Sequence, residues 1–256
     1  MAFNGGDHPT WNTPSRIVKI MALPTTPRLL IFDLDGTLID SRQDLCNSVN
    51  ATLAHLARPS LPDAVIASYI GDGASMLIRR ALGDPDHVED AMLDRALNFF
   101  LTFYRAHKLD FTYVYKGVFD ALQTIRGAHP HLPMAVLTNK PVHPSRDICA
   151  HFGLDRFFFQ NYGGNSFHTK KPDPHGLLKL IAEANALHPS GPPITPSQTV
   201  MIGDSDVDIL TARNAGARSV ACTFGLAPHT LAAAQPDHTV DSPNEWPGAL
   251  FPGLYA

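Results

Sequence analysis

The chain has 256 residues, of which 44% are hydrophobic and 17% are charged, and its formal net charge at pH 7 is −4. This length and composition predict a globular protein of one or two domains with a substantial core. They argue against a nucleic-acid partner, because no lysine- or arginine-rich run is present, and against a membrane protein, because no apolar run is long enough to span a bilayer.

The cysteines and the first residues of the chain bear on the cell compartment. Cys46, Cys149 and Cys222 are scattered, odd in number and without the spacing of metal ligands, which favours reduced thiols in a cytoplasmic protein. Residues 1–27 contain no apolar stretch typical of a signal peptide and are expected to form an N-terminal tail. An extra strand at Arg16–Ile20 is the alternative for this segment.

The apolar run that starts at Leu29 is the first strong structural signal. It predicts a buried strand over residues 29–34, of the kind found in parallel sheets. Asp33 and Asp35 then stand at the carboxyl end of the strand, where open α/β sheets bind ligands. Burying two like charges is costly unless a cation compensates them, so this stretch predicts a divalent cation and chemistry on an anion.

After this strand the pattern becomes helical as far as residue 110. Apolar residues recur at helical spacing after Asp40 or Ser41, which are the candidate N-caps of a first helix. Two more helices are expected over roughly 63–82 and 87–107. The segment therefore predicts an all-helical block inserted between the first strand and the rest of the sheet.

From Lys116 onward, helices and strands alternate. Strands are expected over 133–140, 199–202 and 219–223, with an edge strand at 239–240, and helices lie between them, including one over Pro174–Leu187. This alternation predicts an α/β fold with a doubly wound, Rossmann-like parallel sheet. The predicted domains are a tail (1–27), a core (28–40 and 112–250) and an inserted helical domain (41–111) above the carboxyl edge of the sheet.

Polar residues gather where the predicted strands end. They are Asp33 with Asp35, Thr138 with Asn139, Lys171 in Lys170-Lys171-Pro172, and Asp204 with Asp208. Taken singly, each has an ordinary explanation as a turn residue, a loop cap, a solvated lysine or a charge that complements a helix dipole. Taken together and in this order, they predict a single site.

The order of these segments resembles the haloacid dehalogenase superfamily of phosphotransferases over roughly residues 28–245, and the stretch Asp-Leu-Asp-Gly-Thr-Leu at 33–38 is nearly specific on its own. The resemblance implies that Asp33 is the nucleophile and that Asp35 is the general acid and base. A carboxylate that attacks phosphorus forms an aspartyl-phosphate, which divides one difficult step into two. Asp35 would protonate the leaving alkoxide and later take a proton from water.

The same resemblance implies the ligands of the phosphate and of a Mg²⁺ ion. Thr138, Asn139 and Lys171 would bind the phosphate. The implied metal ligands are Asp33, the backbone carbonyl of Asp35, and Asp204, with Asp208 supporting the metal directly or through water. Mg²⁺ prefers such hard oxygen ligands.

Other branches of the superfamily fit less well. Dehalogenases lack the second aspartate that is present here as Asp35. Phosphonate hydrolases use a lysine of the inserted domain, whereas no lysine occurs between Lys19 and Lys108. Leu45 stands where the β-phosphoglucomutase branch has a histidine.

In this superfamily the inserted domain acts as a cap that selects the substrate. The segment Tyr69–Leu82 is similar to the specificity loop of phosphoglycolate phosphatases. Gly71 and Gly73 would let backbone amides approach a small carboxylate, and Arg79 or its neighbour Arg80 would hold it. The alternative is a glycine-rich turn between helices that binds no ligand.

The resemblance therefore implies a Mg²⁺-dependent phosphatase that hydrolyses a small phosphomonoester, with 2-phosphoglycolate first in line. A phosphatase for a sugar phosphate, a nucleotide or pyrophosphate is the alternative within this class, and a non-catalytic regulatory module is the alternative outside it. The expected partner is a small phosphate ester, without nucleic acid or membrane, and the expected state is a monomer or homodimer. Cap opening is expected at hinges near Asp40–Ser41 and Asp110–Lys116.

Overall fold

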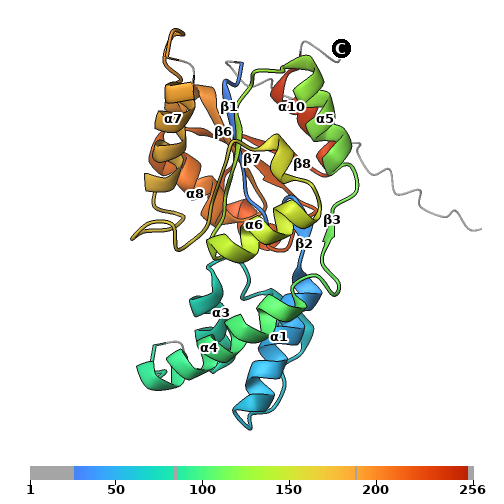
Figure 1. Cartoon of the computed structure of the whole chain (residues 1–256), viewed down its shortest axis with the longest axis vertical. Helices are drawn as coiled ribbons and strands as arrows, with labels where there is room; N and C mark the ends of the chain where they lie inside the picture. Colours follow the sequence, from blue (N-terminus) through green and yellow to red (C-terminus); the bar gives the residue numbers. More distant parts are fainter. Residues whose placement is uncertain (1–25, 84–85, 188, 253–256) are drawn as a thin grey trace, which may run out of the picture.

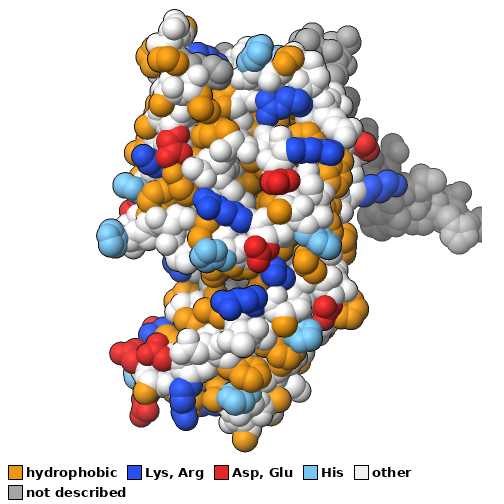
Figure 2. All heavy atoms as spheres, in the orientation of Figure 1, with side chains coloured by type: hydrophobic (Ala, Val, Ile, Leu, Met, Phe, Trp, Pro, Cys, Tyr) orange, Lys and Arg blue, Asp and Glu red, His pale blue; other side chains and the backbone are white. Residues whose placement is uncertain are grey.

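The computed structural model describes residues 26–83, 86–187 and 189–252 (Figure 1). The alternative strand at Arg16–Ile20 and nearly all of the predicted tail lie outside these residues. None of the helices described is both long and apolar enough to cross a membrane. On the face in Figure 2, acidic and basic side chains are interspersed rather than gathered by sign.

A six-stranded parallel sheet forms the centre of the larger lobe, in the order β5-β4-β1-β6-β7-β8. Its strands are β1 (Leu29–Phe32), β4 (Met134–Leu137), β5 (Gln160–Tyr162), β6 (Thr199–Gly203), β7 (Arg218–Cys222) and β8 (His238–Val240). In the middle strand, Leu30 lies opposite Met134 on one side and Val200 on the other. The predicted α/β fold with a doubly wound parallel sheet is confirmed.

Helices cover both faces of this sheet (Figure 1). They are α5 (Val118–Ala128), α6 (Val142–His151), α7 (His175–Leu187), α8 (Asp206–Ala215), α9 (Leu231–Ala234) and α10 (Trp246–Leu250). Successive side chains of a strand point to opposite faces, so Leu30 and Phe32 pack with α5, α6 and α10, while Leu29 and Ile31 pack with α7 and α8. This two-sided burial explains why β1 is apolar at every position.

Four helices form the smaller lobe beyond the carboxyl ends of the strands (Figure 1). They are α1 (Arg42–His55), α2 (Asp63–Ala67), α3 (Ala74–Ala81) and α4 (Asp90–His107). They enclose a hydrophobic cluster of their own, which includes Val49, Leu53 and Phe100. We refer to this lobe as the cap; the domain boundaries given above stay a prediction.

The structure differs from the sequence-based expectations in several elements. The helix expected over 63–82 is two helices, α2 and α3, because the turn between them contains Gly71 and Gly73 with positive φ angles. The strand expected over 29–34 ends at Phe32. An antiparallel pair, β2 (Ile39–Asp40) and β3 (Tyr113–Val114), joins cap and core and was not predicted.

Short elements complete the chain. Single 3₁₀ turns lie at Asp155–Phe157, Pro196–Gln198, Pro228–Thr230 and Pro243–Glu245. Helix α10 was not predicted, yet its Trp246 is fully buried, with its ring centroid 5.3 Å from that of Phe32. The last described segment thus packs directly behind the strand that carries Asp33.

Candidate active site

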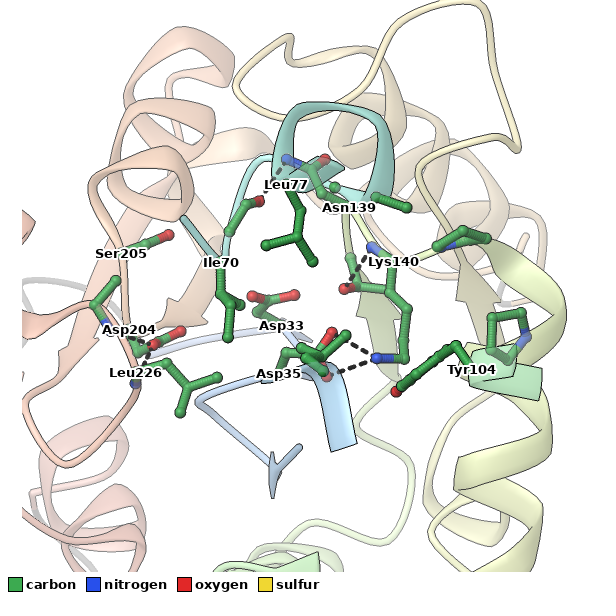
Figure 3. A pocket seen from close by; sticks show the side chains of 18 of the residues that line it. Asp33, Asp35, Ile70, Leu77, Tyr104, Asn139, Lys140, Asp204, Ser205 and Leu226 are labelled. Carbon is green, nitrogen blue, oxygen red and sulfur yellow. Dashed lines mark hydrogen bonds and ion pairs between the residues drawn. The ribbon is translucent and has the colours of Figure 1, made fainter. Parts of the chain in front are cut away.

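The polar residues singled out in the sequence meet at the carboxyl ends of β1, β4 and β6, beneath the cap (Figure 3). Most of them line a cavity of about 50 Å³ between core and cap, whereas Lys171 and Asp208 are not among its lining residues. Asp33, Asp35, Thr138, Asn139 and Asp204 contribute to its wall. Because parallel strands end at the same edge of a sheet, residues far apart in the sequence are brought together here.

Asp33 belongs to a buried chain of charges. The Lys171 Nζ lies 2.9 Å from Asp33 Oδ1 and 2.6 Å from Asp208 Oδ1, and the lysine side chain is 2% exposed. Burial raises the pKa of Asp33 to about 6, although Lys171 opposes this shift. Burial also opposes the charge of Lys171, but Asp208 and Asp33 outweigh it and raise the lysine's pKa. Lys171 is therefore a cation held against the predicted nucleophile.

Asp208 holds both Lys171 and Ser205. Its Oδ2 accepts hydrogen bonds from the Ser205 backbone N–H at 3.2 Å and from the Ser205 hydroxyl at 2.8 Å. These contacts form a capping box at the start of α8. Both oxygens of Asp208 thus have protein partners, which suits a residue that supports the site from behind.

Asp204 is fixed by backbone groups. Its Oδ2 accepts from the backbone N–H of Leu226 at 2.7 Å and of Ala227 at 3.1 Å. A Cβ atom on Gly36 would lie 2.1 Å from the same oxygen, so only glycine fits there. Burial and the neighbouring carboxylates of Asp208 and Asp33 raise the pKa of Asp204 well above its ordinary range.

These carboxylates fit a hard divalent cation. Asp33, Asp204 and Asp208 each offer an oxygen, and the three atoms lie within 4.8 Å of one another. Burial is the main cause of the raised pKa values of Asp33 and Asp204, and repulsion among the three neighbouring carboxylates adds to it. A cation bound among them removes the repulsion, and an all-oxygen donor set suits Mg²⁺.

Asp35 faces the same cavity with a different set of partners. Its Oδ1 accepts from the Ser41 hydroxyl at 2.5 Å. The Lys140 Nζ lies 2.9 Å from Asp35 Oδ1 and 3.1 Å from Asp35 Oδ2 (Figure 3). Ser41 is the N-cap residue of α1, but its hydroxyl makes no capping bond and serves Asp35 instead.

Thr138 and Asn139 follow β4 directly. The Thr138 hydroxyl accepts from the Lys140 backbone N–H at 3.2 Å, which leaves its own proton available to a ligand. The Asn139 amide donates to the backbone carbonyls of Gly71 at 3.0 Å and Lys171 at 3.1 Å. Asn139, predicted as a phosphate ligand, therefore also ties the cap to the core.

Of the three cap residues predicted to bind the substrate, the structure places Gly71 and Gly73 at the cavity and Arg79 away from it. Gly71 and Gly73 line the cavity. A Cβ atom on Gly73 would lie 2.9 Å from the Asn139 carbonyl oxygen, so close packing of cap on core requires glycine there. Arg79 is not among the lining residues, and its guanidinium lies 3.4 Å from Asp90, a cap residue. Its neighbour Arg80 pairs with Asp72 at 2.5 Å.

Sequence reasoning missed several residues of the site. Ser41, Lys140 and Tyr104 surround Asp35, and Ser205 lines the cavity beside Asp204. Lys140 directly follows Thr138-Asn139 at the end of a predicted strand, and this position is the signal that could have identified it as a site residue. Tyr104 looked like one more core aromatic of α4, so no sequence signal distinguished it.

Comparisons with known proteins bear on this arrangement. The profile of the family described as haloacid dehalogenase-like hydrolase matches residues 30–222. A phosphoglycolate phosphatase of Pseudomonas putida is 39% identical over 204 residues, which cover 78% of this chain and 71% of that protein. One of Chromobacterium violaceum is 36% identical over 217 residues, which cover 84% of this chain and 92% of that protein.

A solved structure has a similar fold. The crystal structure of a predicted phosphoglycolate phosphatase from Haemophilus somnus superposes with a TM-score of 0.78 at 28% identity. The superposition covers 87% of this chain and 97% of that one. The predicted superfamily is thereby confirmed, and the chain belongs to the family of haloacid dehalogenase-like hydrolases.

Proposed function

We propose that this hydrolase is a Mg²⁺-dependent phosphatase that cleaves a small phosphomonoester, with 2-phosphoglycolate as its leading substrate. One observation carries the proposal. The buried Asp33 carboxylate lines the cavity with a buried lysine 2.9 Å away and two further carboxylates within 4.8 Å. This arrangement suits attack on a dianion, because it provides a nucleophile, a cation that offsets the negative charge of the phosphate, and carboxylates that would hold a divalent metal.

In the proposed first step, a carboxylate oxygen of Asp33 attacks phosphorus and the bond from phosphorus to the ester oxygen breaks. Lys171 offsets the repulsion between Asp33 and the phosphate, and it stabilises the negative charge on the phosphoryl oxygens in the transition state. The Thr138 hydroxyl donates to one of these oxygens. Asp208 positions Lys171 through their contact of 2.6 Å.

Asp35 manages the protons in this scheme. Its protonated carboxyl gives a proton to the leaving oxygen, and its carboxylate then takes one from the water that attacks the aspartyl-phosphate. Hydrolysis releases phosphate and restores Asp33. Ser41 and Lys140 hold the Asp35 side chain in place through both steps.

Asp33, Asp204 and the backbone carbonyl of Asp35 would hold the metal, and Asp208 would support it. Once bound, a Mg²⁺ ion supplies Lewis-acid stabilisation of the phosphoryl charge and neutralises the clustered carboxylates. The protein fixes its ligands beforehand, because Leu226 and Ala227 clamp Asp204.

The choice of 2-phosphoglycolate follows from the relatives and from the cavity. The similar proteins of Pseudomonas putida and Chromobacterium violaceum carry the name phosphoglycolate phosphatase. The cavity lies between core and cap, where apolar cap residues such as Leu77 and Phe100 narrow the space around Asp33, which suits a small ester. Gly71 and Gly73 at its wall bring cap backbone near the bound molecule.

The test is phosphate release from a panel of 2-phosphoglycolate, a hexose phosphate, a nucleotide and pyrophosphate, ranked by kcat/KM. We expect 2-phosphoglycolate to rank first and EDTA to abolish turnover, with Mg²⁺ restoring it. A hexose phosphate ranking well above 2-phosphoglycolate would show the substrate assignment to be wrong. Turnover that survives metal removal would show the mechanism to be wrong.

The variant Asp33→Asn tests the nucleophile. We expect kcat to fall by at least about 10³-fold, because an amide oxygen is a far weaker nucleophile than a carboxylate. The control is Asp94→Asn, which makes the same chemical change at an exposed position of α4 and should leave kcat unaltered. Circular dichroism of both variants checks that the fold is retained.

A further inference from the structure

Lys140 is the buried cation of the cavity that the scheme above uses only to hold Asp35. Its side chain is 3% exposed. Its Nζ touches both oxygens of Asp35 and lies 4.7 Å from the centroid of the Tyr104 ring. In Figure 3, Lys140 and Tyr104 lie on the side of Asp35 opposite to Asp204. Asp204, a predicted metal ligand, and Lys140 therefore lie on opposite sides of Asp35.

The cap offers mostly apolar groups to this part of the cavity. Its contributions include Leu45, Ile70, Leu77, Phe100 and Leu101. Among the residues that line the cavity, Lys140 is the sole lysine or arginine. Arg79, Arg80 and Lys171 do not line the cavity, and Lys171 is shared between two carboxylates, Asp33 and Asp208, whereas Lys140 pairs with one, Asp35. A second negative group on a substrate would therefore meet Lys140 or have no cation at all, and an unpaired buried charge is costly.

Tyr104 adds a donor beside this lysine. The tyrosine is 3% exposed, and its hydroxyl has no close hydrogen-bond partner among the residues described, although the Lys140 ammonium lies near enough to interact with it. Burial raises the pKa of Tyr104 to about 12, so the phenol keeps its proton at neutral pH. An unsatisfied buried hydroxyl is uncommon in proteins and indicates that a ligand completes its bonding.

The chemistry of the substrate fits this position. In 2-phosphoglycolate, a single carbon separates the ester oxygen from the carboxylate. The ester oxygen must lie next to Asp35 to receive its proton. A cation that contacts Asp35 is therefore within reach of the carboxylate of the same molecule. A lysine has three N–H donors, of which Asp35 takes two here, so one donor stays available.

We propose that Lys140 and Tyr104 form a subsite that binds the carboxylate of the substrate, and that Lys140 determines the preference of the enzyme for phosphate esters with a second anionic group. The inference rests on the proposed function and extends it to the group that distinguishes this substrate from a neutral ester. It assigns recognition to the end of β4 and to α4 rather than to the arginines of α3.

The test compares two substrates that differ only in this group, 2-phosphoglycolate and its neutral amide, 2-phosphoglycolamide. The wild type should have the higher kcat/KM on the acid. In Lys140→Met the ratio of acid to amide should fall by about 10- to 100-fold, the range expected for one charge-assisted hydrogen bond. Lys140→Arg keeps the charge and should retain most of the preference.

Tyr104→Phe provides a second variant that leaves the contact between Lys140 and Asp35 intact. We expect the ratio of acid to amide to fall about 5-fold, as for one neutral hydrogen bond. This variant removes a single oxygen, so it reports on the subsite even where loss of the buried lysine prevents folding. Thermal unfolding of each variant identifies any that are unfolded.

Each outcome has one meaning. If Lys140→Met or Tyr104→Phe lowers kcat/KM on both substrates by the same factor, these residues only position Asp35, and the inference is overturned while the proposed function stands. If the wild type hydrolyses the amide as well as the acid, the subsite assignment is also overturned. If the wild type releases phosphate from neither, the proposed function falls and the inference falls with it.

Discussion

A side chain at residue 36 would occupy the space of the Asp204 carboxylate. Gly36 has a φ angle of +86°, and a Cβ atom built on it would lie 2.1 Å from Asp204 Oδ2. The backbone after the predicted nucleophile therefore passes directly against a predicted metal ligand. Gly225 also packs against Asp204, and a Cβ atom there would lie 2.2 Å from the Asp204 Cβ and 2.4 Å from the Gly36 carbonyl oxygen.

We predict that Gly36→Ala impairs metal binding. The methyl group must displace Asp204, so the Mg²⁺ concentration that gives half-maximal activity should rise by about 10-fold or more, as for other changes that misplace a metal ligand. The matched control is Gly153→Ala. Gly153 also has a positive φ angle, +68°, but a Cβ atom there meets nothing within 4 Å.

The control shares the backbone cost of placing alanine in the left-handed region and lacks the collision. Gly36→Ala should therefore lose more stability than Gly153→Ala, because of the collision, and only Gly36→Ala should need more metal. Metal titrations of phosphate release measure the difference. Equal metal requirements in the two variants would contradict the role assigned to Gly36.

The chain crosses between core and cap twice, and Asp44 of α1 joins the two crossings. The Asp44 carboxylate, 1% exposed, accepts from the backbone N–H groups of Phe111 and Thr112 and from the Thr112 hydroxyl. The distances lie between 2.7 and 3.1 Å. Just beyond, β2 pairs with β3. The hinge is thus a hydrogen-bonded unit rather than two independent linkers.

We predict that Asp44→Ala loosens this hinge. The change leaves three donors without their acceptor, so the free energy of unfolding should fall by about 2–4 kcal/mol. Amide hydrogen exchange at Phe111 and Thr112 should accelerate by more than exchange in the central sheet. Asp94→Ala, at an exposed position of α4, is the control and should change stability by less than about 0.5 kcal/mol. If hydrogen exchange at the Phe111 and Thr112 amides is unchanged, Asp44 does not hold the hinge together.

At the scale of the whole molecule, the cap rests on the core through few polar contacts. Lys108 pairs with Asp147 of α6 at 3.3 Å, Asn139 donates to the Gly71 carbonyl, and the Lys170 Nζ donates to the Asp72 carbonyl at 2.5 Å. The last two acceptors are the ones nearest the cavity. Both acceptors belong to the turn between α2 and α3. The remaining wall of the cavity on the cap side is mostly apolar. Such a contact excludes water when closed and separates at modest cost, which suits a site that must admit substrate and release product.

We predict that locking the cap onto the core stops turnover. Cysteines in place of Asp72 and Lys170, joined by a reducible bifunctional thiol reagent, should reduce the rate of phosphate release to near zero, and cleavage of the link should restore it. The native cysteines, Cys46, Cys149 and Cys222, are buried and should not react. The same double variant without the link is the control. Undiminished turnover in the linked protein would contradict cap motion.

Much of the core and the site was predictable because the signals are local. The strands β1, β4 and β6 are apolar at nearly every position, and Asp33, Thr138 and Asp204 directly follow them. The split of the helix expected over 63–82 has a local cause in Gly71 and Gly73, whereas the elements that were not predicted depend on long-range contacts. The pairing of β2 with β3 depends on two residues per strand, which leaves no periodic pattern. Helix α10 was not predicted because its main contact, the packing of Trp246 on Phe32, joins residues far apart in the chain.

The sequence by itself determined the α/β fold, the family, and the positions of Asp33, Asp35, Lys171 and Asp204, since each is read from neighbours in the chain. Only the tertiary structure decided which groups surround these residues. Lys140 meets Asp35 across 105 positions, and Arg79 meets Asp90 instead of the cavity. The physical reason is that burial and charge pairing act through space. The sequence shows which side chains are present, whereas burial and charge pairing in the folded chain determine which of them are in contact.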